Sequence, residues 1–178
     1  MISGKGNPND VDFSNRVGAL YSLAYAVKSS YKAVSLQEEI HDFAVYPLEG
    51  IWTKINEDYL DKSKLEYTIM IRQPDFISEE MVNEALGMVR IKKPNPLLEE
   101  IHFGTMQNGL CVEVLHVGAF DDEPVSFEKM DQFSAAHGLR RSESYHREIY
   151  LSNANRVEKS KLKTILRYSV EQIPAGSV

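Results

Sequence analysis

Apolar side chains recur at helical spacing over residues 12–32, and the positions between them are mostly polar. The apolar stripe consists of Val17, Leu20, Tyr21, Ala24, Val27 and Tyr31. Such a stripe is typical of an amphipathic helix with one face on a core. We therefore predict an N-terminal packing helix at 12–32, and we expect the polar residues 1–10 to be flexible. One helix followed by strand-like sequence does not favour a DNA-binding helix-turn-helix.

The later part of the chain shows one layout twice, in which a strand leads through a short loop into a helix and then a second strand. Ser78 is an N-cap candidate for the first helix, and Gly138 follows the end of the second. We expect the first copy to contain strand 65–72, helix 78–92 and strand 98–103, and the second to contain strand 110–117, helix 124–137 and strand 145–152.

Two further segments are strand-like. Residues 163–170 form the last strand-like segment, and 43–56 contains Pro47 and Gly50 three residues apart. Proline and glycine this close disturb a central strand, so we predict a bulge or kink there. Repeated strand-helix-strand units favour a two-layer α+β fold, with helices on one face of a curved antiparallel sheet and a ligand cleft on its concave face.

Composition narrows the class of protein. The 178 residues are 43% hydrophobic, which suits a single domain spanning 1–178. A formal net charge of −6 argues against direct nucleic-acid binding and favours cationic small molecules. A single cysteine excludes an internal disulfide, and no segment resembles a signal peptide or membrane span. We expect a cytoplasmic protein without membrane contact.

The common catalytic motifs are absent. The five histidines show no metal-ligand spacing, so we expect no metal site. Neither a phosphate-binding glycine loop nor a serine nucleophile elbow is present, and we expect no cofactor.

The segment 145–152 carries the strongest candidate chemistry. Strand alternation places His146, Glu148 and Tyr150 on one face, with Arg147 on the other. A carboxylate on a largely apolar strand must be solvated, hydrogen-bonded or directed into a cavity. We interpret Glu148 and Tyr150 as candidate catalytic residues and His146 as a candidate ligand contact; a solvent-exposed strand face is the alternative.

Other candidates lie on separate elements. Glu113 and His116 fall on opposite faces of the strand at 110–117, so either could face the cleft. Trp52 beside the predicted kink is the best candidate for an aromatic wall. The remaining candidate ligand contacts are Glu49, Tyr67, Met70, Phe103 and Phe120.

Four ordered motifs together resemble the GyrI-like small-molecule-binding family. They are Tyr46-Pro-Leu-Glu-Gly-Ile-Trp52, Ile69-Met-Ile-Arg-Gln-Pro-Asp-Phe76, Leu115-His-Val-Gly-Ala-Phe-Asp-Asp-Glu-Pro124 and Glu148-Ile-Tyr-Leu-Ser152. The resemblance implies duplicated strand-helix-strand-strand units around a central cleft. In the family's multidrug sensors, a glutamate at the position of Glu148 attracts cationic aromatic drugs.

The chain resembles the family's stand-alone branch more closely than its multidrug sensors. Members of that branch hydrolyse cyclopropane-bearing, DNA-alkylating antibiotics of the yatakemycin and duocarmycin type. That branch usually has His-His-Glu-Ile-Tyr-Leu, whereas Arg147 replaces the second histidine here. The resemblance implies hydrolysis in which Glu148, helped by Glu49 or Glu113, orients or deprotonates water. Non-catalytic binding of planar or cationic molecules is the alternative, and inhibition of gyrase by protein contact has the least residue-level support.

Overall fold

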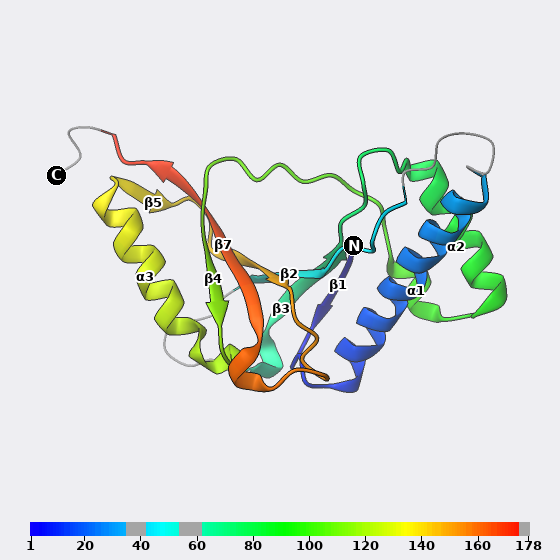
Figure 1. Cartoon of the computed structure of the whole chain (residues 1–178), viewed down its shortest axis with the longest axis horizontal. Coiled ribbons are helices and arrows are strands. Elements are labelled where there is room, and N and C mark those ends of the chain that lie inside the picture. Colours follow the sequence, from blue (N-terminus) through cyan, green and yellow to red (C-terminus); the bar gives the residue numbers. More distant parts are fainter. Residues whose placement is uncertain (35–41, 54–61, 175–178) are drawn as a thin grey trace.

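The computed structural model describes residues 1–34, 42–53 and 62–174. Within these ranges the chain forms three α-helices and seven strands, which confirms the predicted α+β class (Figure 1). None of the helices within these ranges is both long enough and apolar enough to cross a bilayer.

The strands form one curved sheet in the order β1-β3-β2-β6-β7-β4, and every neighbouring pair is antiparallel. The short β5 pairs with β7 outside this path. The strand bounds are β1 Ile2–Lys5, β2 Leu48–Thr53, β3 Glu66–Ile71, β4 Cys111–Val117, β5 Leu139–Arg141, β6 Tyr145–Tyr150 and β7 Lys163–Gln172.

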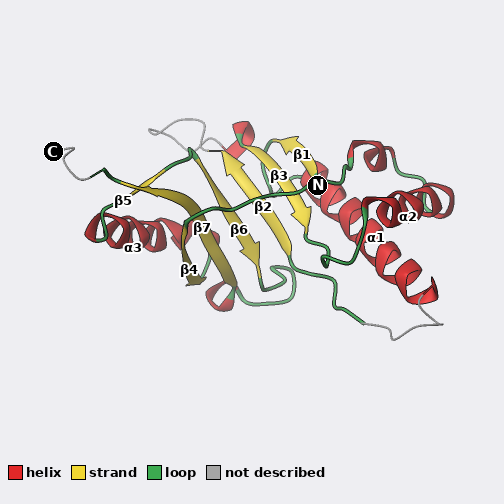
Figure 2. Ribbon diagram, turned by 90° about the horizontal axis from the view of Figure 1, so that it is seen from above, coloured by secondary structure: helices red, strands yellow, loops and turns green. Residues whose placement is uncertain are grey.

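The helices are α1 (Val11–Val34), α2 (Glu79–Lys92) and α3 (Glu123–Ala136). Viewed from above, α1 and α2 lie beside the β1 end of the sheet, and α3 lies near the β4 end (Figure 2). All three predicted helices are present, and each of their ends lies within two residues of the predicted position. Ser78 caps α2 by accepting a hydrogen bond from the Met81 amide at 3.3 Å, as its position predicts.

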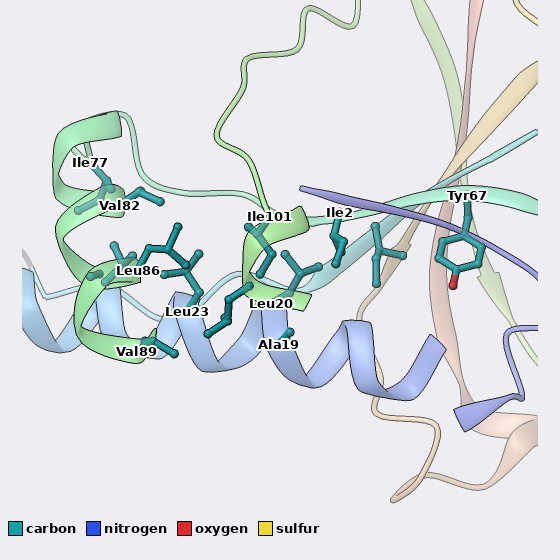
Figure 3. Packing of buried hydrophobic residues seen from close by; sticks show 14 of the residues in the cluster. Ile2, Ala19, Leu20, Leu23, Tyr67, Ile77, Val82, Leu86, Val89 and Ile101 are labelled. Carbon is teal, nitrogen blue, oxygen red and sulfur yellow. The ribbon is translucent and has the colours of Figure 1, made fainter. Parts of the chain in front are cut away.

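The core consists of two clusters, one in each half of the sheet. The larger cluster joins α1 and α2 to β1 and β3, with Ile2 and Ile69 fully buried in it (Figure 3). The smaller cluster joins α3 to β4 and β7 around Leu166 and Tyr168. The register aligns Ile69, Gly50, Glu148 and Leu166 across four strands, so both clusters lie on the same face of the sheet. We call this the helical face.

The strand order is symmetric about the β2–β6 pair. Exchanging β1 with β4, β3 with β7 and β2 with β6 gives the same order, β1-β3-β2-β6-β7-β4, read from the opposite edge of the sheet. The repeated unit is therefore strand-helix-strand-strand, β1-α1-β2-β3 and then β4-α3-β6-β7, as the family resemblance implies. The expected duplication between 65–103 and 110–152 is wrong, because α2 lies between the two units rather than inside the first.

Three local predictions also differ from the structure. Residues 98–103 are not a strand, because Asn95 caps a 3₁₀ helix at Pro96–Glu100 and an irregular segment follows. Residues 1–10, expected to be flexible, contain strand β1, whose Ile2 is buried against the first core cluster.

The predicted kink in 43–56 is absent from the part that the structure describes. Pro47 lies just before β2, where it does not interrupt the ladder, and Gly50 lies within an unbroken register from Leu48 to Thr53. Residues 43–47 are not a strand, and 54–56 lie outside the described residues.

The segment from Ile101 to Leu110 has no regular secondary structure and crosses the face of the sheet opposite the helical face (Figures 1 and 2). We call this segment the strap. It connects the first unit, with α2 appended, to β4 of the second.

Candidate functional site

Glu148 lies on the helical face of β6, at the centre of the sheet, and is 8% exposed. Nε2 of His146 lies 2.8 Å from Oε1 of Glu148. Because an ionised carboxylate can only accept, Nε2 carries the proton in this bond. The predicted placement of His146 and Glu148 on one face is therefore observed.

Tyr150 extends the group toward the other half of the sheet. Its hydroxyl accepts a hydrogen bond from Nε1 of Trp52 at 2.8 Å, and it lies near enough to Glu148 to feel the charge of that carboxylate. The hydroxyl end is enclosed although part of the ring is exposed. Burial, and next the negative charge of Glu148, raise the pKa of Tyr150 well above its usual value, so the phenol keeps its proton.

Glu123, at the first position of α3, completes the group. Burial and the neighbouring Glu148 raise the pKa of Glu123 to about 9, and its carboxyl hydrogen-bonds Glu148. At neutral pH Glu123 is therefore a protonated acid beside a carboxylate. The site combines one proton donor with one acceptor, both carboxyl groups.

Glu123 was missed by the sequence analysis. It follows Asp121 and Asp122 at a helix start, where acidic residues usually complement the helix dipole at the surface. Its weak signal is its place in the motif around Phe120, which the family resemblance had already singled out.

Aromatic rings lie on both sides of the site. Phe120 contacts Tyr150 edge-on at 5.9 Å between ring centroids, and Phe127 contacts His146 at 4.8 Å. From the other half, Phe13 of α1 stacks on Trp52 at 5.8 Å. Phe120 is 41% exposed, so solvent reaches this side of the site.

Two predicted ligand contacts on this face, Tyr67 and His116, are held by other residues of the protein. Tyr67 is buried in the first core cluster against Phe13 and Trp52. His116 is buried, and its ring bonds the Ser126 hydroxyl at 2.9 Å and the Ala119 carbonyl at 3.0 Å. Both lie behind the site rather than in it.

The structure does not bring the remaining candidates to Glu148. Glu49 points to the opposite face, where it forms a buried ion pair with Arg147. Glu113 also lies on that face, is exposed, and pairs with Arg167 at 2.8 Å. Neither carboxylate can assist Glu148 from there, because the sheet separates them. Arg147 points away from Glu148, as strand alternation predicts.

Met70 and Phe103 accompany Glu49 on the strap side. All three line a cavity of about 600 Å³ between the strap and the sheet. The candidates assigned to one cleft thus divide into a group on each face of the sheet. Among the described residues, no cluster of histidine, cysteine and carboxylate side chains is suited to a metal ion.

Comparison with known proteins relates this geometry to a family. The model of the GyrI-like small-molecule-binding domain matches residues 1–169. An uncharacterised conserved protein from Listeria innocua is 35% identical in sequence with a TM-score of 0.87, and the match covers 96% of this chain and 85% of that one. A hydrolase from Listeria innocua is 34% identical with a TM-score of 0.83 over the same shares of the two chains. A search of curated proteins found no match. The chain therefore belongs to the GyrI-like small-molecule-binding family.

Proposed function

We propose that the chain binds a small planar or cationic aromatic molecule beside Glu148 and adds water across a strained cyclopropane ring of such a molecule. Small-molecule binding is the function of the family. The proposal of cyclopropane hydrolysis is supported by the resemblance to cyclopropanoid hydrolases, by the hydrolase from Listeria innocua among the similar structures, and by the chemistry of the carboxyl pair.

The arrangement that carries the proposal is the buried pair of Glu148 and Glu123, in which burial and the charge of Glu148 raise the pKa of Glu123 to about 9. Addition of water to a cyclopropane conjugated to a carbonyl needs a base at the water and an acid at the carbonyl oxygen. Two carboxyl groups with different protonation states supply both roles at neutral pH.

The proposed reaction proceeds without a cofactor. Glu148 removes a proton from water while the water oxygen bonds to a ring carbon. One ring C–C bond breaks, and its electron pair moves into the conjugated carbonyl, whose oxygen takes the proton of Glu123. A proton then passes from Glu148 to Glu123 along their hydrogen bond, which restores both groups after the net addition of one water.

The remaining residues of the site orient these groups. The bond from Trp52 holds the Tyr150 hydroxyl toward Glu148, and His146 bonds the same carboxylate from its other side. Phe120 and Phe127 offer ring faces and edges to a planar substrate. A strained, conjugated ring is already reactive, so positioning and proton transfer suffice.

The test is incubation of the protein with a cyclopropane-bearing alkylator, followed by mass spectrometry of the small molecule. The proposal expects a product heavier by one water, formed in proportion to enzyme and lost in Glu148→Gln. Recovery of the alkylator unchanged from a stable complex would reject hydrolysis.

The second candidate function is non-catalytic binding of cationic aromatic molecules. It is favoured by the single negative charge of the Glu148–Glu123 pair at the centre of a ring-lined site. In this case a cationic dye would bind tightly, Glu148→Gln would weaken its binding, and no alkylator would be converted.

A further inference from the structure

The cavity beneath the strap lies on the face of the sheet opposite Glu148. At about 600 Å³ it falls within the range of small-molecule sites, roughly 300–1,000 Å³. Glu49, Arg147 and Ile149 lie on its sheet side, and Phe103 and Asn108 belong to the strap. It shares none of its lining residues with the Glu148 site described above.

One end of the cavity is apolar. Its wall there comes from the inner faces of α1 and α2 and the loop before α2, through Leu20, Leu23, Ala24, Val27, Ile77 and Val82. These side chains are almost fully buried within the first core cluster or beside it. An apolar ligand body would gain free energy by contact with them.

The other end is polar. Arg147 of β6 and Arg167 of β7 line it as cross-strand neighbours, and they pair with Glu49 and Glu113, respectively. Guanidinium groups bind carboxylates through two parallel hydrogen bonds, so this end suits an anionic head group.

Arg147 is the central group of this polar end. Its side chain is 12% exposed and pairs with Glu49, whose side chain is 8% exposed. It also donates from Nη1 to Oδ1 of Asn108 at 2.6 Å, which joins the sheet to the strap. A buried ion pair contributes little to stability relative to apolar residues of the same size. Nε of Arg147 is buried and has no hydrogen-bond partner among the described residues, so it has a donor left for a ligand.

We propose that this cavity is a second ligand site that takes an apolar molecule with one carboxylate. The apolar body lies against α1 and α2, and the carboxylate lies at Arg147 with Arg167 beside it. The two faces of the sheet then differ in ligand charge. The Glu148 face attracts cations, and the strap face binds anions.

The probe for this site is octanoate, with 1-octanol as a matched neutral control of equal chain length, both titrated calorimetrically. We expect one octanoate per chain, with 1-octanol binding at least about 10-fold more weakly. Glu148→Gln should bind octanoate within about 2-fold of the parent, because the sheet separates the two sites. This independence distinguishes failure of the second site from failure of the proposed hydrolysis.

Two variants test whether octanoate binds in this cavity. Ala24→Phe fills the apolar end and should weaken octanoate binding at least about 10-fold. The double variant Glu49→Leu/Arg147→Met removes the ion pair without leaving a lone buried charge, and should weaken octanoate about 10-fold while changing 1-octanol by less than about 2-fold. Thermal unfolding checks each fold, and the double variant alone decides the assignment if Ala24→Phe does not fold.

No saturable binding of octanoate to the parent protein would overturn the proposal. Equal affinities for octanoate and 1-octanol would overturn the assignment of a carboxylate ligand. Unchanged octanoate affinity in the folded double variant would place the ligand elsewhere.

Discussion

Glu123 and Glu148 have the same functional group but different charge states. Glu148 accepts a hydrogen bond from His146, whereas Glu123 is buried beside a carboxylate that is already negative. Two like charges in contact within a poorly solvated site are unfavourable, so one of the pair keeps its proton. The difference in environment, rather than in residue type, makes an acid of one and a base of the other.

Glu148→Gln should abolish the proposed chemistry without unfolding the protein. Glutamine keeps the shape and can still hydrogen-bond, but it has neither the charge nor the basic oxygen. Loss of a general base commonly costs about 100- to 10,000-fold in rate. The assay is conversion of the alkylator, with thermal unfolding measured in parallel.

Glu113→Gln is the matched control, because Glu113 is an exposed carboxylate on the opposite face. Its activity should equal that of the parent. Equal activity of the Glu148→Gln protein at equal stability would make Glu148 an ordinary structural residue.

Glu123 should make the free energy of unfolding depend on pH. Its pKa is about 9 in the folded chain and near its usual 4.5 when unfolded, so the folded state binds the extra proton between these values. The stabilisation from this proton is complete below about pH 4.5 and is lost as the pH rises toward 9, at no more than about 1.4 kcal/mol per pH unit.

Urea unfolding across this pH range measures the effect. Glu123→Gln, which cannot titrate, should flatten the decline of stability with increasing pH. The same slope in both proteins would mean that Glu123 does not retain its proton in the folded state.

At the scale of elements, alternation along β6 separates two kinds of chemistry. Glu148 and Tyr150 face the helices, while Arg147 faces the strap and pairs with Glu49 of β2. The same alternation on β2 sends Trp52 to the helical face and Glu49 to the other. Neighbouring residues on a strand therefore serve different sites, because successive side chains point to opposite faces of the sheet.

Gly50 on β2 keeps room for the hydrogen bond from Trp52 to Tyr150. A Cβ at this position would lie 2.7 Å from Nε1 of Trp52 and 3.1 Å from the Tyr150 hydroxyl. Gly50→Ala should therefore displace both side chains and destabilise the fold by about 1–3 kcal/mol. Urea unfolding and the tryptophan emission spectrum measure the two effects.

Gly87→Ala provides the control, because Gly87 lies inside α2 with no atom within 4 Å of an added Cβ. Alanine should stabilise this helix by about 0.5–1 kcal/mol. If Gly50→Ala were equally well tolerated, the Trp52–Tyr150 contact would not require glycine.

At the scale of the whole molecule, the site lies where the two pseudo-equivalent halves meet. Trp52 comes from β2, the innermost strand of the first half, and Tyr150 and Glu148 come from β6, the innermost strand of the second. Trp52 belongs to the first core cluster, and the second cluster lies on the other side of Glu148. A ligand beside Glu148 would therefore contact both halves at once.

Trp52 should report ligand binding at this junction. It is the only tryptophan of the chain and is hydrogen-bonded to Tyr150, so a cationic aromatic molecule at Glu148 should quench its fluorescence. The Glu148→Gln protein should show no quenching at the same ligand concentration. A saturating ligand that leaves both intensity and wavelength of the parent emission unchanged would place the site elsewhere.

Much of the local structure follows from the sequence alone. The apolar stripe of residues 12–32, the cap at Ser78 and the glycine after α3 are short-range signals, and each predicts its element correctly. The common face of His146 and Glu148, and the opposite direction of Arg147, follow from a period of two. These features depend on backbone geometry within a few residues, and that geometry is encoded locally.

Only the tertiary structure decided how the elements combine. The segment 98–103 was misassigned, and the first copy of the repeat was placed to begin at β3, which is the last strand of the observed first unit. Strand β1 was not recognised, because the strand partners of Ile2 lie more than 60 residues away. Likewise, no local pattern shows that Glu49 and Glu113 lie across the sheet from Glu148, or that Glu123 touches it. Pairing order and the burial of charge depend on contacts between distant segments, so they are determined by the packing of the whole chain.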